Sequence, residues 1–410
     1  MSECFVIVGA GHAAGQAAAS LRQKGFSGKI IMVGEEPYVP YQRPPLSKKF
    51  LAGELEEKRL YYKPENYYPD HDVELRLNTK VESIDRAKKT LGLSDGDTLA
   101  YDKLLLTTGS QVRTMPVPGT ELSGVHYLRS IDDVKSIQSR FATGTRLVIV
   151  GAGYIGLEVA AVAISNGLDV TVLEMAERAM NRVMDKTCTD FFEKVHRDAG
   201  VKLLFNTQVT AFEGDTSIQT VITGNGDRYD ADLVIIGIGI LPATGIAEQA
   251  GLECENGILV DEFCQTNDPD ILAAGDCTNH PNPLLDRRFR LESVHNALEQ
   301  AKTAAATLCG EPIAYAQIPW FWSDQYDIKL QIVGLSQDYD QLIIRGNPAE
   351  RSFAAFYMKG NKLLAVDAIN SPREFMLAKK LLAKGVTFDP VQLADESVDF
   401  KQLATQALEH

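Results

Sequence analysis

The sequence predicts an α/β protein with two glycine-rich βαβ units and a smaller C-terminal α+β domain. A strand, a glycine-rich turn, a helix and a second strand follow one another at residues 147–174, and a similar order occupies residues 5–35. From about residue 320 the chain instead shows short runs rich in β-branched and aromatic residues, separated by turn residues. These three observations define the fold class.

The central βαβ unit is complete. A buried strand at Leu147–Val150 leads into the glycines, a helix extends to about Asn166, and a second strand, Val170–Leu173, ends on Glu174. An acid about 20 residues beyond the glycines is placed to accept hydrogen bonds from the hydroxyls of an adenine ribose. This context makes the motif specific, because a glycine-rich turn alone also occurs without any ligand.

The three glycines of this unit have separate functions. Gly151 permits a tight turn, Gly153 lets the backbone approach a pyrophosphate, and Gly156 lets the helix pack closely on the strand. The helix N-terminus then presents free N–H groups and a positive dipole end to phosphates. The unit is therefore predicted to bind a dinucleotide.

A second copy lies at the N-terminus. A strand at Phe5–Val8 precedes a helix from about Ala13 to Lys24, and a strand at Ile30–Val33 leads to Glu35. The small residues of its turn are Gly9, Gly11 and Ala14. Two such units imply two bound dinucleotides, unless one copy is purely structural.

The segment Tyr38–Lys48 contains three prolines, which exclude a regular helix or a central strand. We expect a loop leading to a helix that Ser47 could cap. Arg43 and Lys48 bring basic groups close to the first unit. The alternative is an ordinary solvated surface loop.

The order of the remaining elements predicts domain boundaries. A strand within 101–109 is followed by a segment rich in proline and glycine, which is typical of a loop. The strand at 231–239 is the last of the central domain, and we expect the chain to return to the first domain after it. We predict further strands at Val201–Phe205, Val209–Phe212, Ser217–Thr223, Ile258–Val260 and 271–276, the last ending on a glycine and a carboxylate, and a helix at Val294–Leu308. The predicted domains are 1–112 with 244–319, 113–243, and 320–410.

The C-terminal domain is predicted to be an antiparallel sheet with one final packing helix. The predicted strands are Lys329–Val333, Gln341–Arg345, Ser352–Met358 and Leu363–Ala368, with a hairpin turn at Gly360–Asn361. Pro372 starts the helix and Gly385 ends it. Its apolar positions are Phe375, Met376, Leu381 and Leu382.

The net charge and the cysteine pattern disfavour several classes of partner and of site. A net charge of −14 disfavours nucleic acid and anionic membranes as partners. The six cysteines are scattered without a C-x-x-C pair, so we expect isolated thiols and no metal site. The longest apolar run is too short for a membrane span, and we expect a cytoplasmic protein.

Five short segments carry specific motifs: 43–48 (RPPLSK), 151–158 (GAGYIGLE), 275–277 (GDC), 292–297 (ESVHNA) and 320–325 (WFWSDQ). With these motifs the chain resembles the FAD-dependent pyridine-nucleotide reductases of the glutathione-reductase fold. It resembles in particular the ferredoxin reductases that supply bacterial haem-thiolate monooxygenases and ring-hydroxylating dioxygenases. The resemblance covers nearly the whole chain.

The resemblance implies two Rossmann-like dinucleotide-binding domains, a discontinuous one for FAD and an inserted one for NAD. The positions that match FAD contacts are Gly9, Gly11, His12, Ala13, Ala14, Glu35, Arg43, Lys48, Val81, Thr108, Gly109, Arg129, Gly275, Asp276, Val294 and Trp320. The positions that match NAD contacts are Gly151, Gly153, Tyr154, Ile155, Gly156, Glu158, Glu174, Gly237, Ile238 and Gly239.

The resemblance also implies roles. Asp276 would bind the ribitol, and the helix that Val294 opens would stabilise the reduced flavin ring. Lys48 and Glu158 resemble the charged pair beside flavin N5 and the nicotinamide, although either could be an ordinary surface residue. In such enzymes NADH passes a hydride to the flavin, which returns electrons singly to a [2Fe–2S] ferredoxin.

The residues around Glu174 predict NADH rather than NADPH. A carboxylate accepts from a 2′-hydroxyl and repels a 2′-phosphate, and the next two residues, Met175 and Ala176, supply no cation. Arg178 is the one nearby group that could favour NADPH.

The same fold also serves other functions, and the sequence bears on them unequally. Disulfide reductases carry cysteines opposite the flavin, whereas residues 35–60 contain none. Rubredoxin or monodehydroascorbate reductases share the flavin chemistry, and a protein like apoptosis-inducing factor would use NADH as a switch. An acidic ferredoxin would dock on basic residues near the flavin motifs, making turnover fall as salt rises. The candidates are Lys63, Arg287, Arg288, Arg290 and Lys302.

Overall fold

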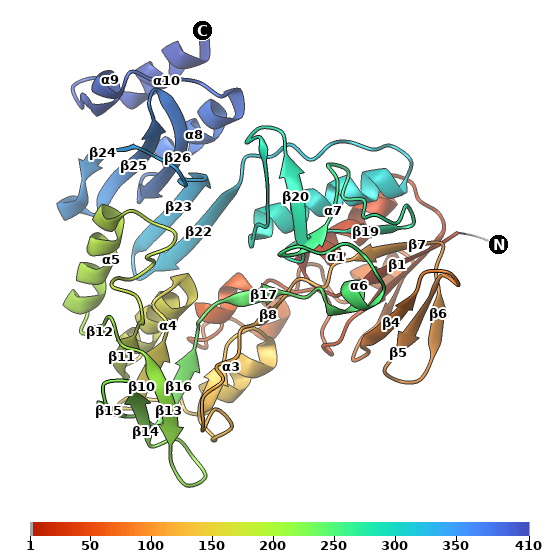
Figure 1. Cartoon of the computed structure of the whole chain (residues 1–410), viewed down its shortest axis with the longest axis horizontal. Coiled ribbons are helices and arrows are strands. Elements are labelled where there is room, and N and C mark those ends of the chain that lie inside the picture. The colour runs from red at the N-terminus through yellow and green to blue at the C-terminus, as the bar shows by residue number, and fades with distance from the viewer. Residues whose placement is uncertain (1–2, 410) are drawn as a thin grey trace. The chain divides into compact units, whose positions relative to one another are not determined.

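A computed structural model of the chain describes residues 3–409 and confirms the α/β fold class (Figure 1). Backbone contacts divide the chain into two compact units. The first comprises Met1–Gln42, Glu57–Gln111 and Leu241–Phe321, and the second comprises Arg43–Glu56, Val112–Ile240 and Trp322–His410. The division into three domains stays a prediction. No helix of the described chain is long and apolar enough to cross a membrane.

The first unit is built on a five-stranded parallel sheet in the order β19-β7-β1-β2-β3. Its strands are β1 (Cys4–Val8), β2 (Lys29–Val33), β3 (Val73–Arg76), β7 (Lys103–Leu106) and β19 (Ile271–Ala273). Helices α1 (His12–Gln23) and α7 (Val294–Leu308) bury rows of alanines against the sheet. The small side chains allow close packing, and β1 and α1 begin within one residue of their predicted starts.

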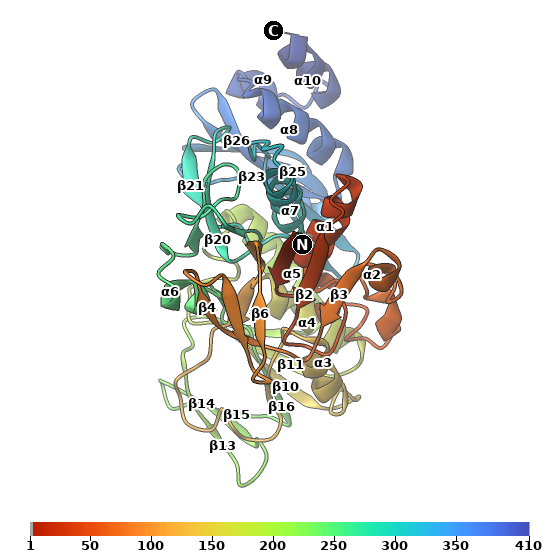
Figure 2. The ribbon, with the colours of Figure 1, turned by 90° about the vertical axis from the view of Figure 1, so that its right-hand side faces the viewer.

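Smaller elements complete the first unit. β4 (Val81–Asp85), β5 (Thr90–Leu93) and β6 (Thr98–Ala100) form an antiparallel sheet (Figure 2). Its apolar residues belong to a core shared with β1, β2 and β7. The other elements are β18 (Ile258–Leu259), β20 (Thr278–Asn282), β21 (Arg287–Phe289), the 3-10 helix η2 (Glu57–Arg59), α2 (Tyr67–Asp70) and α6 (Gly245–Gln249). β8 (Ser110–Val112) and β17 (Ile240–Pro242) carry the chain between the units.

The second unit contains another five-stranded parallel sheet, in the order β12-β11-β10-β16-β9. Its strands are β9 (Val125–Tyr127), β10 (Arg146–Val150), β11 (Asp169–Leu173), β12 (Lys202–Leu204) and β16 (Leu233–Ile236). As in the first unit, the strand that leads into the glycines is central. The helices are α3 (Ile131–Gln138), α4 (Tyr154–Ser165) and α5 (Lys186–Asp198), and an antiparallel sheet adds β13 (Val209–Glu213), β14 (Thr220–Thr223) and β15 (Arg228–Asp230).

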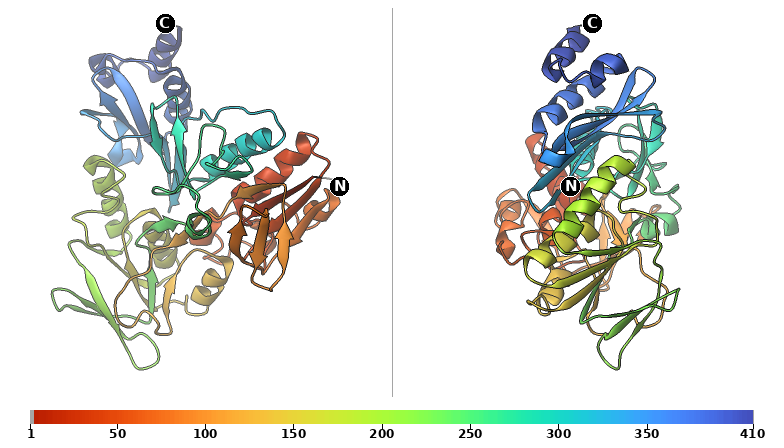
Figure 3. Two further views of the ribbon diagram at one scale, coloured as in Figure 1. Left: turned by 45° about the vertical axis from the view of Figure 1, so that its right-hand side comes forward. Right: turned by 90° about the vertical axis from the view of Figure 1, so that its left-hand side faces the viewer.

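The C-terminal part of the second unit is the predicted antiparallel sheet, with one strand more than predicted (Figure 3). The order is β22-β23-β26-β25-β24, formed by β22 (Trp320–Gln325), β23 (Ile328–Gly334), β24 (Gln341–Asn347), β25 (Ser352–Lys359) and β26 (Lys362–Ile369). The predicted hairpin turn at 360–361 joins β25 to β26. The 3-10 helix η3 (Pro348–Glu350) precedes β25.

Two predictions about the C-terminal helix were wrong. Helix α8 (Pro372–Lys384) ends at Gly385 as predicted, but α9 (Pro390–Ala394) and α10 (Phe400–Glu409) follow it. Met376 is 55% exposed instead of packed. It comes directly after the buried Phe375, and one residue turns a helix by about 100°, so Met376 leaves the buried stripe.

A buried carboxyl group lies in the centre of this sheet. Asp367 on β26 is 2% exposed, and the hydroxyl of Tyr357 on β25 donates to its Oδ2 at 2.6 Å. Burial raises the pKa of Asp367 to about 7. The carboxyl is therefore neutral in the folded chain at a pH where the unfolded chain carries it charged.

This pKa makes stability depend on pH. Because the folded pKa lies above the unfolded one, the contribution is undiminished below about pH 4 and is lost as the pH rises to about 7. Relative to an Asp367→Asn variant, the wild type should lose about 2 kcal/mol of unfolding free energy between pH 5 and pH 7. Urea unfolding of both proteins at each pH measures this, and parallel curves would contradict the assignment.

Candidate functional site

The glycine-rich turn of the first unit leaves open space at its central glycine. Gly9 has a φ of +109°, and a Cβ there would lie 2.3 Å from the carbonyl oxygen of Thr107. A Cβ on Gly11 would meet nothing within 4 Å, and α1 begins at the next residue, His12. The turn is therefore fixed by close backbone contact, with room beside Gly11 for a group at the helix N-terminus.

The carboxyl ends of the parallel strands bring the other candidates of the first unit to the same edge of the sheet. A Cβ on Gly275 would lie 3.4 Å from the Cβ of Ala13 and 3.8 Å from that of Ala297, so the turn after β19 lies against the starts of α1 and α7. The Ser110 hydroxyl donates to Asp276 at 3.0 Å. Glu35, which follows β2, is largely exposed and pairs with Lys80 at 3.4 Å.

A serine caps the start of α7. The Ser293 hydroxyl accepts from the backbone N–H of Asn296, and Val294 is the first helical residue. The ring of His295 lies 5.4 Å from that of Trp320. This arrangement leaves the first N–H groups of a 15-residue helix pointing out of its end.

Gln300 is a buried residue that the sequence did not single out. Its Oε1 atom accepts from the backbone N–H of Gly275 at 2.8 Å, from the Thr278 hydroxyl at 2.9 Å and from the Asn296 amide at 3.2 Å. It thus fixes the Gly275–Asp276 turn to α7. Only its position in the helix that follows the Gly-Asp turn could have indicated it.

The remaining flavin candidates are divided between the units. In the first unit, Val81 is buried at the start of β4, and the Thr108 hydroxyl donates to the Ala243 carbonyl at 2.7 Å, next to Gly109. In the second unit, the Arg43 guanidinium donates to the carbonyl of Arg129 at 2.7 Å. Ala14 is fully buried in α1.

The second unit repeats the geometry of the glycine turn. Gly151 has a φ of +106°, and a Cβ there would lie 2.5 Å from the carbonyl oxygen of Gly237. A Cβ on Gly156 would lie 2.1 Å from the Gly151 oxygen, whereas one on Gly153 would meet nothing within 4 Å. The outer glycines hold strand and helix together, and the central one borders open space.

The acid of the second unit is held by the backbone. The Glu174 carboxylate accepts from the N–H of Ala152 at 2.7 Å and from that of Ala176 at 2.8 Å. It therefore lies beside the glycine turn, at the carboxyl end of β11. Met175 is 72% exposed next to it.

The guanidinium of Arg178 is engaged within the chain. It donates to the carbonyls of Met184 and Asn181 and to the Thr189 hydroxyl. These bonds reduce its capacity to bind a 2′-phosphate.

The other nicotinamide candidates surround the same turn. Gly237 follows β16 and donates its N–H to Val150, and Ile238 and Gly239 come next. Tyr154 is the first residue of α4, and Ile155 is 43% exposed. The structure therefore brings the glycine turn, the acid and the 237–239 segment together at the carboxyl ends of β10, β11 and β16.

Lys48 and Glu158 form a buried ion pair in the second unit. The Lys48 Nζ lies 2.7 Å from Glu158 Oε2, with 17% and 1% of the side chains exposed. The Ser47 hydroxyl donates to the same Oε2 at 2.5 Å, and the Ser323 hydroxyl donates to Oε1 at 2.6 Å. Glu158 is therefore not a surface residue, and its charge is compensated by an ammonium and two hydroxyls.

The predicted helix cap at Ser47 was wrong. Residues Pro44–Ser47 form a short 3-10 helix, η1, and the chain leaves helical geometry at Lys48. The hydroxyl that would have capped a helix donates to Glu158 instead, 111 residues away in the sequence. Local sequence offers no sign of such a distant partner.

All six cysteines are free thiols, as expected. Burial raises the pKa of each of them, and the thiolate is the reactive form of cysteine. Among residues 3–409, no cluster of His, Cys, Asp and Glu side chains could hold a metal ion. Burial therefore disfavours the reactive form at every cysteine.

The basic residues proposed for ferredoxin docking all lie in the first unit, and most have partners within it. Lys63 lies over the rings of Tyr62 and Tyr67. Arg288 donates to two carbonyls, Arg290 pairs with Glu292, and Lys302 pairs with Glu299. Arg287 is exposed on β21.

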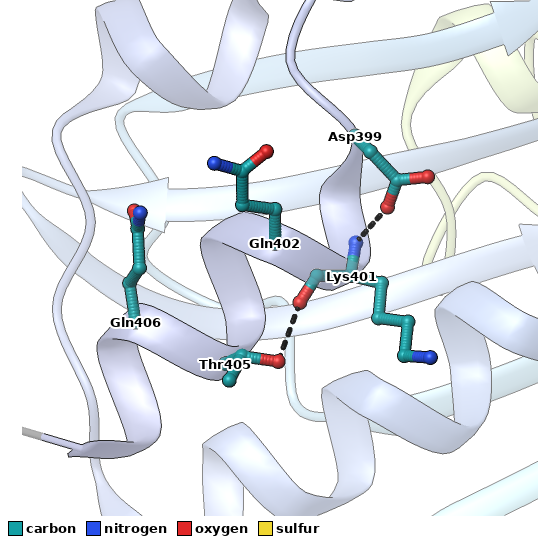
Figure 4. A pocket seen from close by; sticks show the side chains of 5 residues that line it. All are labelled: Asp399, Lys401, Gln402, Thr405 and Gln406. Atoms are coloured by element: carbon teal, nitrogen blue, oxygen red, sulfur yellow. Dashed lines mark hydrogen bonds between the residues drawn. The ribbon is translucent and has the colours of Figure 1, made fainter.

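A pocket at the C-terminus contains none of the candidate residues. It lies on α10 and is lined by Asp399, Lys401, Gln402, Thr405 and Gln406 (Figure 4). Asp399 accepts from the Lys401 N–H, and Thr405 donates to the Lys401 carbonyl. Because these bonds belong to the helix and its cap, the pocket is a surface feature of α10.

Comparison with known proteins places this geometry in a family. Residues 4–301 match the pyridine nucleotide-disulphide oxidoreductases, and residues 320–404 match the Reductase C-terminal family. The chain is 43% identical to putidaredoxin reductase of Pseudomonas putida, over 98% of this chain and 97% of that protein. It is also 43% identical to rhodocoxin reductase of Rhodococcus erythropolis, over 97% and 93%.

A solved structure supports the same placement. The crystal structure of the covalent putidaredoxin reductase–putidaredoxin complex contains a chain that matches this one with a TM-score of 0.97 and 42% identity, over 100% of this chain and 99% of the other. The similarity thus extends through both glycine-rich turns and the C-terminal sheet. The chain belongs to the ferredoxin reductases of the pyridine nucleotide-disulphide oxidoreductase family.

Proposed function

We propose that this protein is an FAD-containing, NADH-dependent ferredoxin reductase. It passes electrons to a [2Fe–2S] ferredoxin that feeds a haem-thiolate monooxygenase or a ring-hydroxylating dioxygenase. The observation that carries the proposal is the pair of glycine-rich turns in one chain, each with open space at its central glycine, Gly11 or Gly153. Its relatives putidaredoxin reductase and rhodocoxin reductase are named for the same kind of activity.

The family implies FAD and NAD(H), and the residues present fit both. The first unit would hold FAD through the start of α1, Glu35, the Gly275–Asp276 turn and the start of α7. The chemistry that FAD supplies when bound is the exchange of a hydride for single electrons. The second unit would hold the nicotinamide nucleotide through its glycine turn and Glu174, with the Lys48–Glu158 pair acting on the nicotinamide. The domains would be 1–112 with 244–319 for FAD, 113–243 for NAD, and 320–410.

The thiols support single-electron transfer directly to a protein acceptor. Residues 35–60 contain no cysteine, and burial raises the pKa of all six thiols elsewhere. A disulfide relay needs a reactive thiolate. Electrons would therefore leave the flavin without a cysteine intermediate. As to its oligomeric state, the protein would work as a monomer or a homodimer.

The decisive experiment is NADH-driven reduction of a purified [2Fe–2S] ferredoxin, followed through cytochrome c. The control omits the ferredoxin. Strong dependence on ferredoxin supports the proposal. Flavin reduction without transfer to any ferredoxin, but with transfer to rubredoxin or monodehydroascorbate, would replace it with one of those activities.

Glu174→Ala should erode the preference for NADH. The wild type is expected to favour NADH, and removing the carboxylate should cut the NADH-to-NADPH ratio of kcat/KM about tenfold, because a hydrogen bond to a charged group is worth about 1.5 kcal/mol or more. The exposed Glu177→Ala is the matched control. A wild-type enzyme that works faster with NADPH would overturn this prediction.

A further inference from the structure

A chain of hydrogen bonds reaches Glu158 from the far side of the ion pair. The Tyr326 hydroxyl lies 3.0 Å from His196 Nδ1, and His196 Nε2 lies 2.9 Å from Gln325 Oε1. The Gln325 Nε2 atom donates to Ser323 Oγ at 3.2 Å, and Ser323 donates to Glu158 Oε1 at 2.6 Å. These residues come from α4, α5, β22 and the turn after β22.

The chemistry of the groups fixes the direction of every bond. A carboxylate only accepts, so the Ser323 hydroxyl must donate to Glu158 and can accept from the Gln325 amide. The Gln325 Oε1 atom also only accepts, so His196 must carry its proton on Nε2. All the donors therefore point toward the carboxylate, and their dipoles reinforce one another.

His196 is in the protonation state that this direction requires. It is 0% exposed, and burial lowers its pKa to about 4. A neutral ring with a proton on Nε2 leaves Nδ1 as an acceptor, and the Tyr326 hydroxyl can donate to it. The chain thus begins at a tyrosine and ends at Glu158 without a reversal.

The backbone at Tyr326 supports a specific role for its hydroxyl. Tyr326 has a φ of +56°, in the left-handed region that disfavours a bulky side chain. Its ring lies 5.0 Å from the His196 ring, centroid to centroid. A glycine or asparagine would suit this hairpin turn better, so packing and the bond to His196 must hold the tyrosine there.

The two carboxylate oxygens of Glu158 have separate sets of donors. Oε2 accepts from Lys48 and Ser47, whereas Oε1 accepts from Ser323. Ser323, Gln325 and His196 are each no more than 1% exposed, so water cannot replace a missing donor freely. Orientation of the carboxylate therefore depends on both sets.

We propose that Ser323, Gln325 and His196 are positioning residues that keep the Glu158 carboxylate oriented for the nicotinamide. The inference rests on the function proposed above. It adds residues of the C-terminal sheet and of α5 to the residues that prepare Glu158 for hydride transfer. They act through Glu158 and touch neither the substrate nor the flavin.

The test is a double-mutant cycle on the rate at which NADH reduces the flavin of the holoenzyme. Ser323→Ala should lower this rate about tenfold, because a buried charged acceptor loses its donor. In a Glu158→Gln background the same substitution should change it less than about twofold, since the two residues act as one unit. Ser323→Thr, which retains the hydroxyl, should restore most of the rate.

The control is Ser352→Ala, which makes the same change at an exposed position of the same sheet and should leave the rate unchanged. An equal loss on Ser323→Ala in both backgrounds would overturn the inference, because the effect would then be general to the fold. An increase in the KM for NADH alone, with an unchanged limiting rate of flavin reduction, would also overturn it.

A second readout does not depend on a variant that must fold. Nitrogen-15 NMR of histidine-labelled wild-type holoenzyme should show His196 neutral with its proton on Nε2. A proton on Nδ1 would reverse the chain and overturn the inference. Failure of the proposed function has a different signature: a wild-type flavin that NADH does not reduce, or that reduces no ferredoxin, with the histidine spectrum unaffected.

Discussion

Gly153→Ala is expected to weaken NADH binding about a hundredfold, which corresponds to about 2.7 kcal/mol, while the protein still folds and retains FAD. A Cβ at this position meets no atom of the chain within 4 Å, and φ is −79°, which alanine adopts readily. The methyl group therefore occupies only the space into which a pyrophosphate would approach. Titration with NAD⁺ and thermal unfolding of the same sample measure the two effects separately.

Gly156→Ala is the matched control, because it should reduce the stability of the fold more than it reduces NADH binding. Its Cβ would lie 2.1 Å from the Gly151 carbonyl oxygen, so α4 would have to move away from β10. This variant should lose stability before it loses any specific contact. A Gly153→Ala protein that binds NADH normally would show that the nucleotide does not approach this turn.

Much of the fold follows from local signals. The helix predicted at Val294–Leu308 has those bounds in the structure, because a serine cap and a long run of good helix formers define it. Strands β10 and β11 are apolar runs that end at a glycine and an acid, which is the pattern of a buried parallel strand. Such signals involve neighbouring residues only.

What the sequence missed depends on distant partners. Strand β22 was not predicted, since its Ser323 and Gln325 are polar residues at buried positions and break the expected alternation. Their burial is possible only because Glu158 and His196, which are more than 120 residues away, complete their hydrogen bonds. Ser47 likewise bonds to Glu158, 111 residues away in the sequence.

The charged pair was recognisable from the family motifs, but its environment was not. The sequence allowed Glu158 to be a surface helix residue, and a salt bridge at a surface is worth little. In the structure the carboxylate is 1% exposed and accepts three hydrogen bonds or ion-pair contacts. The two environments differ enough that the contribution of the pair to the unfolding free energy can be measured.

Lys48→Met should therefore lower the unfolding free energy by about 3 kcal/mol, because it leaves a buried carboxylate without its counter-ion. The double variant Lys48→Met/Glu158→Gln should recover most of this loss, since a neutral amide needs no counter-ion and can accept from one of the two serine hydroxyls while its N–H donates to the other. Lys186→Met, which breaks the exposed pair with Asp190, is the control and should cost no more than about 0.5 kcal/mol.

The activities of these variants should not follow their stabilities. If the pair acts on the nicotinamide, the double variant regains stability yet reduces its flavin with NADH as slowly as the single one, because it lacks both charges. Urea unfolding and stopped-flow reduction on the same three proteins test this. A double variant that recovers both properties would mean that Lys48 and Glu158 stabilise the fold and have no part in the chemistry.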